Sequence, residues 1–197
     1  MEKQLEKYLL SENSYLYAIL DGASVPDLPM RLYELRPHQI CLYRGELEPD
    51  LAEVAPYLVY LMPGTEFTDW LLANCWGKHW GIFVQTQFSM VEVRKNFRKL
   101  LTVHDEAGNP LLFRYYDPRV LTRFLPTCEG DDLRLFFERA SAIYAESADA
   151  QELIRYQTDN ERLIQTKFSV TAEQQQQFGD FYQPIPAQPT GGFNSYA

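Results

Sequence analysis

The sequence predicts an α/β protein, with a mixed sheet flanked by helices in an N-terminal lobe and a smaller helix–hairpin–helix C-terminal lobe. Three observations lead to this fold class. Apolar runs of strand length recur in the first half of the chain, amphipathic helical stretches alternate with them, and a helix and two strands follow later. We expect an α/β lobe over residues 1–125, a smaller α+β lobe over 126–183 and a Pro/Gly-rich tail over 184–197.

The first elements are short. Asp21 and Gly22 form a turn after a buried apolar run, and the run at 57–62 is typical of a strand that is covered on both faces. The expected order is a helix at 1–10, a strand at 15–23, a helical turn at 28–35, and strands at 40–43 and 57–62.

Two helices have clearer start signals. Thr65 can cap the first, and Gly77 ends it before a strand at 80–86. The second begins with a capping box of Ser89 and Glu92. Its buried stripe is Val93, Phe97, Leu100 and Leu101, and its exposed face carries Arg94, Lys95, Arg98 and Lys99.

A hairpin and three further helices follow. Residues 101–105 and 110–116 predict two strands joined by a four-residue loop. Asp117 then caps a helix and pairs with Arg119, which predicts a structural clasp at the lobe boundary. Beyond it we expect a helix from Asp131 whose apolar face extends to Tyr144, strands about a turn at 159–160, and a short helix opened by Thr171 and Gln174.

The charge is acidic overall, with one local exception. The formal net charge is −9, which argues against nucleic acid or an anionic membrane as the main partner. Within residues 94–123 the sign reverses, because basic side chains outnumber Asp105, Glu106 and Asp117. We therefore expect a basic patch on an acidic body.

The sequence indicates a cytoplasmic protein. Three cysteines in apolar contexts are typical of reduced, buried thiols: Cys41, Cys75 and Cys128. No apolar run is long enough for membrane insertion, and the first residues lack the features of a secretory signal.

Enzyme motifs are absent from the sequence, so we expect no catalytic, metal or cofactor site and no small-molecule substrate. The elbow around a nucleophilic serine, the phosphate-binding loop, the zinc helix motif and the dinucleotide fingerprint do not occur. His38, His79 and His104 stand in unrelated contexts. Cys75 near His79 could form a thiol–imidazole pair, but a packed thiol is favoured.

Two features remain as candidates for partner binding. Trp76 and Trp80 surround a tight helix-to-strand connection, and they either cover the core or anchor a partner. The basic helix face is either solvated or a contact surface, formed by Arg94, Lys95, Arg98 and Lys99.

Five segments together resemble the family called domain of unknown function 4123. They are LYAILDGA, APYLVYL, WLLANCWGKHWGIF, VRKNFRKLLTV and FRYYDPRVLTRFLP, in this order over roughly residues 15–137. The resemblance implies a cytosolic adaptor of bacterial type VI secretion, which binds a toxic effector and delivers it to the valine–glycine-repeat spike protein. It implies no catalytic residue. The ending at 193–196 has no counterpart in the family.

Two alternatives stay open. The chain could be an α/β enzyme with an unrecognised active site, or a subunit of a constitutive complex whose aromatic side chains, 14% of the sequence, are buried at the interface.

Overall fold

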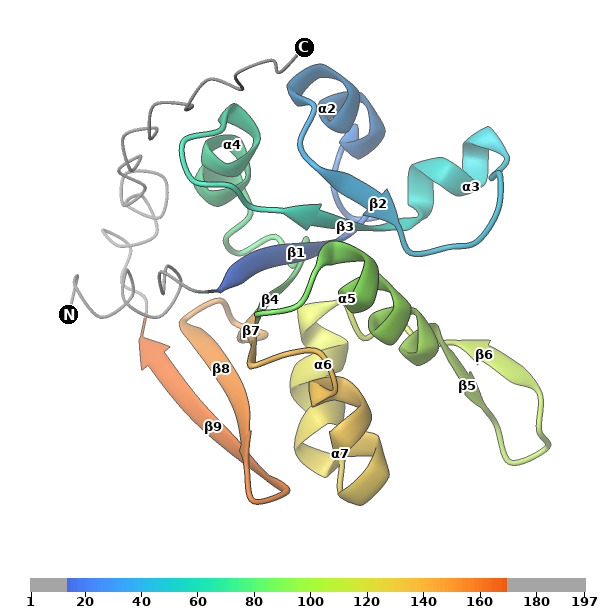
Figure 1. The fold of residues 1–197 in the computed structure, drawn as a ribbon, viewed down its shortest axis with the longest axis vertical. Helices are drawn as coiled ribbons and strands as arrows, with labels where there is room; N and C mark the ends of the chain where they lie inside the picture. Colours follow the sequence, from blue (N-terminus) through green and yellow to red (C-terminus); the bar gives the residue numbers. More distant parts are fainter. Residues whose placement is uncertain (1–13, 170–197) are drawn as a thin grey trace, which may run out of the picture.

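A computed structural model describes residues 14–169, which form a large antiparallel sheet flanked by helices (Figure 1). The seven strands of the sheet, in chain order, are β1 (Tyr15–Asp21), β2 (Gln39–Cys41), β3 (Pro56–Tyr60), β4 (Gly81–Thr86), β7 (Ala142–Glu146), β8 (Glu152–Asp159) and β9 (Arg162–Ser169). A separate hairpin consists of β5 (Thr102–His104) and β6 (Pro110–Leu112). The helices are α2 (Leu28–Leu35), α3 (Pro49–Val54), α4 (Glu66–Asn74), α5 (Met90–Phe97), α6 (Pro118–Phe124) and α7 (Gly130–Phe137).

The strand order is β2-β3-β1-β4-β7-β8-β9. β1 lies between β3 and β4, with Tyr17 opposite Tyr60 on one side and Val84 on the other. Each strand pairing in the described part of the chain is antiparallel, so the expected mixed sheet is wrong in this detail. Helix α2 connects β1 to β2 and helix α4 connects β3 to β4. The two strands of each connection run in the same direction, but an antiparallel strand lies between them in the sheet.

Alternation along the strands gives the sheet an apolar core on each face. Ile19, Ile82 and Ile143 point to one side, where α5, α6 and α7 pack. Ala18 and Leu20 point to the other, where α2 and α4 pack. Because both faces are covered, the central strands read as continuous apolar runs.

The sheet continues across residue 125, where the sequence suggested a boundary between lobes. β7 pairs with β4, with Phe83 opposite Tyr144, and β8 and β9 extend the sheet from there. Leu133 and Phe136 of α7 belong to the same core cluster as Ile82. The helices expected at 1–10 and after Thr171, and the tail at 184–197, lie outside the described residues.

Several expected elements are confirmed and one is wrong. β1, α2, β3, α4, β4, α5 and the β8–β9 hairpin occur where the sequence places them. The helix expected from Asp131 to Tyr144 ends at Phe137, and residues 142–146 form the fully buried strand β7. Its apolar residues fit a helical stripe, but the backbone N–H of Ser141 bonds the Gln85 carbonyl at 2.8 Å and leads the chain into the sheet. None of the helices in residues 14–169 is long and apolar enough to cross a membrane.

Candidate protein-docking groove

Helix α5 presents the basic residues in a fixed orientation. The capping box forms as expected, because Glu92 accepts hydrogen bonds from the Ser89 N–H (3.1 Å) and hydroxyl (2.7 Å). Val93 and Phe97 are fully buried against the sheet. The opposite face of α5, and of the 3-10 turn at Arg98–Leu101, is therefore held toward solvent.

Two of the four basic residues on this face are already engaged. The Arg94 guanidinium is half-buried and donates from Nε to the Cys41 carbonyl (2.7 Å) and from Nη2 to the Tyr43 carbonyl (2.9 Å). Lys99 forms an ion pair with Glu138 at 2.8 Å. Arg94 therefore ties α5 to the edge of the sheet, and the expectation of four solvated cations is wrong for this residue.

The remaining cations line a groove between α3, the end of α5 and the β5–β6 hairpin. Lys95 and Arg98 lie on one wall and Arg44 on another, and none of the three forms an ion pair within residues 14–169. Burial, and then the positive charges of Arg44 and Arg94, lower the pKa of Arg98. Like charges are thus crowded around Arg98, whereas Glu138, which pairs with Lys99, also attracts Lys95.

Leucines form the apolar part of this groove, which we call the basic groove. Leu51 of α3 and Leu112 of β6 are 44% and 56% exposed, and Leu47 also lines the groove. The free volume is ≈620 Å³, and the described lining contains no acidic side chain. Figure 1 shows α3 and the hairpin on the same side of the molecule, with α5 between them. The basic groove thus combines exposed apolar surface with unpaired positive charge.

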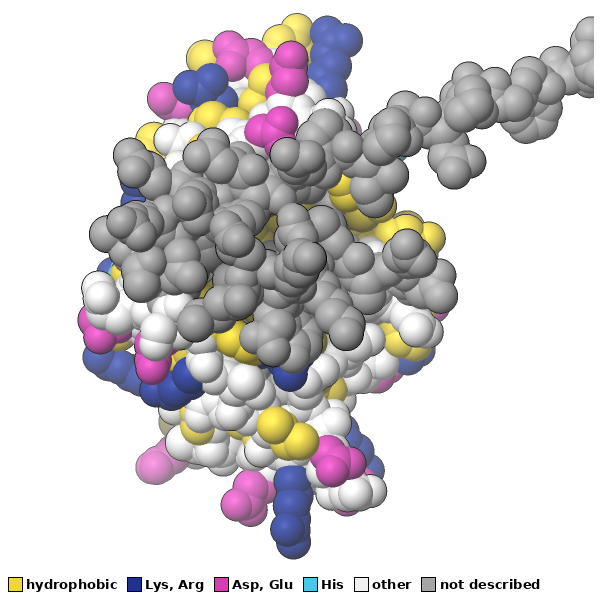
Figure 2. Space-filling model, turned by 90° about the vertical axis from the view of Figure 1, so that its left-hand side faces the viewer, with side chains coloured by type: hydrophobic (Ala, Val, Ile, Leu, Met, Phe, Trp, Pro, Cys, Tyr) yellow, Lys and Arg dark blue, Asp and Glu magenta, His cyan; other side chains and the backbone are white. Residues whose placement is uncertain are grey.

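Other parts of the surface have mixed charge. On the face shown in Figure 2, acidic and basic side chains are intermingled at both the upper and the lower end. Mixed charge of this kind is ordinary for a soluble domain. The lining of the basic groove differs from this face, because its charged side chains are all basic among the described residues.

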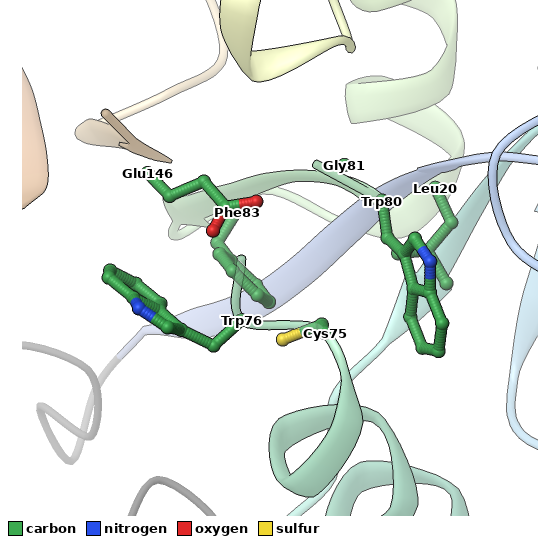
Figure 3. A pocket seen from close by; sticks show the side chains of 7 residues that line it. All are labelled: Leu20, Cys75, Trp76, Trp80, Gly81, Phe83 and Glu146. Carbon is green, nitrogen blue, oxygen red and sulfur yellow. The ribbon is translucent and has the colours of Figure 1, made fainter. Parts of the chain in front are cut away.

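The tryptophans lie on the opposite face of the sheet from α5. Figure 3 shows their indoles on either side of Cys75, pointing away from each other. Trp80 is 6% exposed and stacks on Trp70 with ring centroids 5.6 Å apart. Trp76 donates its indole N–H to the Ala150 carbonyl at 3.0 Å. Both rings therefore contribute to packing around the connection from α4 to β4.

A buried carboxylate that the sequence analysis did not identify holds this connection. Glu146 of β7 accepts hydrogen bonds from the backbone N–H groups of Gly77 (2.6 Å) and His79 (2.5 Å), which both have positive φ. Burial raises the pKa of Glu146, and these hydrogen bonds oppose the rise. Because β7 was assigned to a helix, Glu146 could not be placed opposite Gly77. The adjacent cavity has ≈10 Å³ of free space, about enough for one water molecule.

His79 has a carboxylate neighbour, and Cys75 packs in an apolar core cluster. The His79 Nδ1 atom lies 3.0 Å from Glu146 Oε1. Burial raises the pKa of the Cys75 thiol to about 12, which opposes thiolate formation. In residues 14–169, no group of three or more His, Cys, Asp or Glu side chains could hold a metal ion.

The predicted clasp between Asp117 and Arg119 is present, and Arg114 of the same segment makes a second carboxylate–guanidinium pair. Asp117 is 5% exposed and accepts from the Arg119 backbone N–H (2.9 Å), Nε (3.0 Å) and Nη2 (2.7 Å), so it caps α6 and pairs with Arg119. Asp21, the turn residue after β1, is fully buried and pairs with Arg114. The sequence did not indicate the second pair, because 93 residues separate its members.

One family model matches more than half of the chain. The model of the family described as Domain of unknown function (DUF4123) matches residues 16–135. The chain belongs to this family. No curated protein and no solved structure is significantly similar to the chain. The family match spans α3, α5 and the hairpin, so the walls of the basic groove lie within it.

Proposed function

We propose that this family member is a cytoplasmic, non-catalytic adaptor of type VI secretion, which binds a toxic effector and helps to load it onto the valine–glycine-repeat spike protein. The family resemblance suggests the secretion role. The observation that carries a binding role is the basic groove, where Arg44, Lys95 and Arg98 have no ion-pair partner among residues 14–169 beside exposed leucines.

Such a groove favours a protein segment with carboxylates and apolar side chains. A carboxylate placed among the three cations would relieve their mutual repulsion, and apolar contact with Leu51 and Leu112 would remove exposed surface from water. The net charge of −9 disfavours nucleic acid, whose phosphates the rest of the surface would repel.

The test is co-purification with the products of neighbouring genes, an effector and a spike protein, using a charge-reversed groove. We choose Lys95→Glu with Arg98→Glu, because neither residue makes an ion pair in the described structure. Arg94 is left intact because it holds the sheet edge. We expect the variant to fold and to lose one of the two partners.

The matched control is Arg123→Glu with Arg162→Glu. Both residues are exposed outside the basic groove, and the pair changes the net charge by the same amount. The control should retain both partners. Capture of both partners by the folded groove variant at moderate salt would exclude the groove as a docking site, and failure of the unaltered chain to bind either partner would refute the adaptor function.

A further inference from the structure

A second hollow lies on the other side of α3, between α3, α2 and the turn that follows β1. It has ≈620 Å³ of free volume and includes Pro26, Asp27, Met30, Tyr33, Glu53 and Val54 in its lining. We call it the acidic hollow. Leu51 of the same helix lines the basic groove, so α3 separates the two.

The acidic hollow is lined by apolar side chains that are largely exposed to solvent and do not pack in the core. Leu28 and Leu32 bury one face of α2 in the core, whereas Tyr33 and Met30 on its other face are 77% and 61% exposed. Val54, at the end of α3, is 44% exposed. These three side chains contribute little to the core, and together they form apolar surface available to a partner.

The charges at the hollow are opposite to those of the basic groove. Asp27 and Glu53 are exposed carboxylates with no ion pair within residues 14–169. The neighbouring cation Arg31 is already paired with Glu34 at 3.6 Å. The lining itself contains no basic side chain among the described residues.

Hydrogen bonds and close packing hold the floor of the hollow in place. Asp21 accepts hydrogen bonds from the Ala23 N–H (3.1 Å) and the Ser24 hydroxyl (2.8 Å), which fixes the turn after β1. Gly22 packs so closely on the end of α3 that a Cβ atom there would lie 2.5 Å from the Glu53 carbonyl oxygen. A partner would therefore not have to order this loop when it binds.

We infer that the acidic hollow is a second docking surface, which takes a segment with basic and apolar side chains from the partner that does not occupy the basic groove. This rests on the proposed adaptor function, since an adaptor must contact two proteins. Charge complementarity assigns the occupant: Lys or Arg would approach Asp27 and Glu53, and apolar side chains would cover Tyr33 and Met30. Because the two surfaces differ in sign, one segment would not fit both.

The test compares three purified proteins for binding to the effector and the spike separately, by calorimetry or pull-down. The hollow variant is Tyr33→Ala with Glu53→Lys, and the groove variant is Lys95→Glu with Arg98→Glu. Val91→Ala with Asp50→Lys is the matched control, because Val91 is 69% exposed and neither residue lines the hollow. Removing an aromatic anchor and reversing a charge should weaken the Kd for one partner by roughly tenfold or more.

The expected pattern is complementary. The hollow variant should lose the partner that the groove variant keeps, and each should prevent the three-protein complex from forming. If the unaltered chain binds both partners and the hollow variant binds both equally well, the inference is overturned while the adaptor function stands. Loss of the same partner in both variants, or loss only of self-association measured by light scattering, would also overturn it. If the unaltered chain binds neither partner, the adaptor function itself fails.

Discussion

Replacing Asp117 with alanine should destabilise the fold by about 2 kcal/mol. Its carboxylate caps α6 through the Arg119 backbone N–H, and loss of an N-cap costs about 0.5–2 kcal/mol. The ion pair adds at most about 1 kcal/mol, because the Arg119 side chain is 52% exposed and can turn toward water. The cost of about 3–5 kcal/mol for a broken buried pair is therefore not expected here.

Urea unfolding, followed by circular dichroism and analysed by linear extrapolation, measures this difference. For a domain of this size, about 2 kcal/mol corresponds to a decrease in Tm of roughly 4–8 °C. Arg119→Ala is the control, since it leaves the cap intact and should cost no more than about 1 kcal/mol. Equal losses for the two variants, or no loss for Asp117→Ala, would show that the cap does not stabilise α6.

The pH dependence provides a second check on the same residue. Burial alone would raise the pKa of Asp117, but the hydrogen bonds and charge of Arg119 outweigh it, so the pKa lies below its ordinary value. A lowered folded-state pKa gives stability that is present above the unfolded pKa of about 3.9 and is lost as the pH falls below it. The difference between the unaltered chain and Asp117→Ala should therefore shrink below about pH 4.

Two further predictions follow from buried groups. Arg94→Ala should lower the free energy of unfolding in urea by about 1.5–3 kcal/mol, because it leaves the Cys41 and Tyr43 carbonyls without their charged donor. The control Lys95→Ala should lower it by less than about 0.5 kcal/mol. Similar losses for the two variants would contradict the proposed contact between α5 and the sheet edge. A thiol reagent at pH 8 should leave Cys75 unlabelled until urea unfolds the chain, because burial raises its pKa to about 12. Peptide mapping locates the label, and rapid labelling of Cys75 in the folded chain would contradict its burial.

Patterns among neighbouring residues predicted most of the helices and strands, whereas features that depend on residues far apart in sequence were not predicted. The Ser89 capping box and the turn between β8 and β9 depend on neighbours in sequence, so α5 and the β8–β9 hairpin could be placed from the sequence. The turn itself lies at Asn160 and Glu161, one residue later than expected. β7 could not, because its apolar run follows α7 closely and fits the same helical period until Ser141 bonds to the sheet. The antiparallel pairing of the strands was also not predicted, because periodicity carries no information about the direction in which a strand runs.

For the same reason, the sequence predicted only one wall of the basic groove. Lys95 and Arg98 share one helix, so their common face follows from the helical period. Arg44 and Leu51, on the other wall, lie some 50 residues earlier, and only the fold brings them to α5. The engagement of Arg94 by two backbone carbonyls was equally invisible from the sequence.

Several residues in the segments that carry the family resemblance make contacts within the protein, and some of these contacts hold the two proposed docking surfaces. Arg114 pairs with Asp21, and Asp21 fixes the turn on which Gly22 packs against α3. Arg114 therefore contacts the carboxylate that fixes the turn lining the acidic hollow. Arg94 holds the segment at Cys41 and Tyr43, which leads to Arg44 in the basic groove. Lys95 and Arg98 of the basic groove belong to one of the segments that carry the resemblance, whereas Met30, Tyr33 and Glu53 of the acidic hollow lie outside those segments.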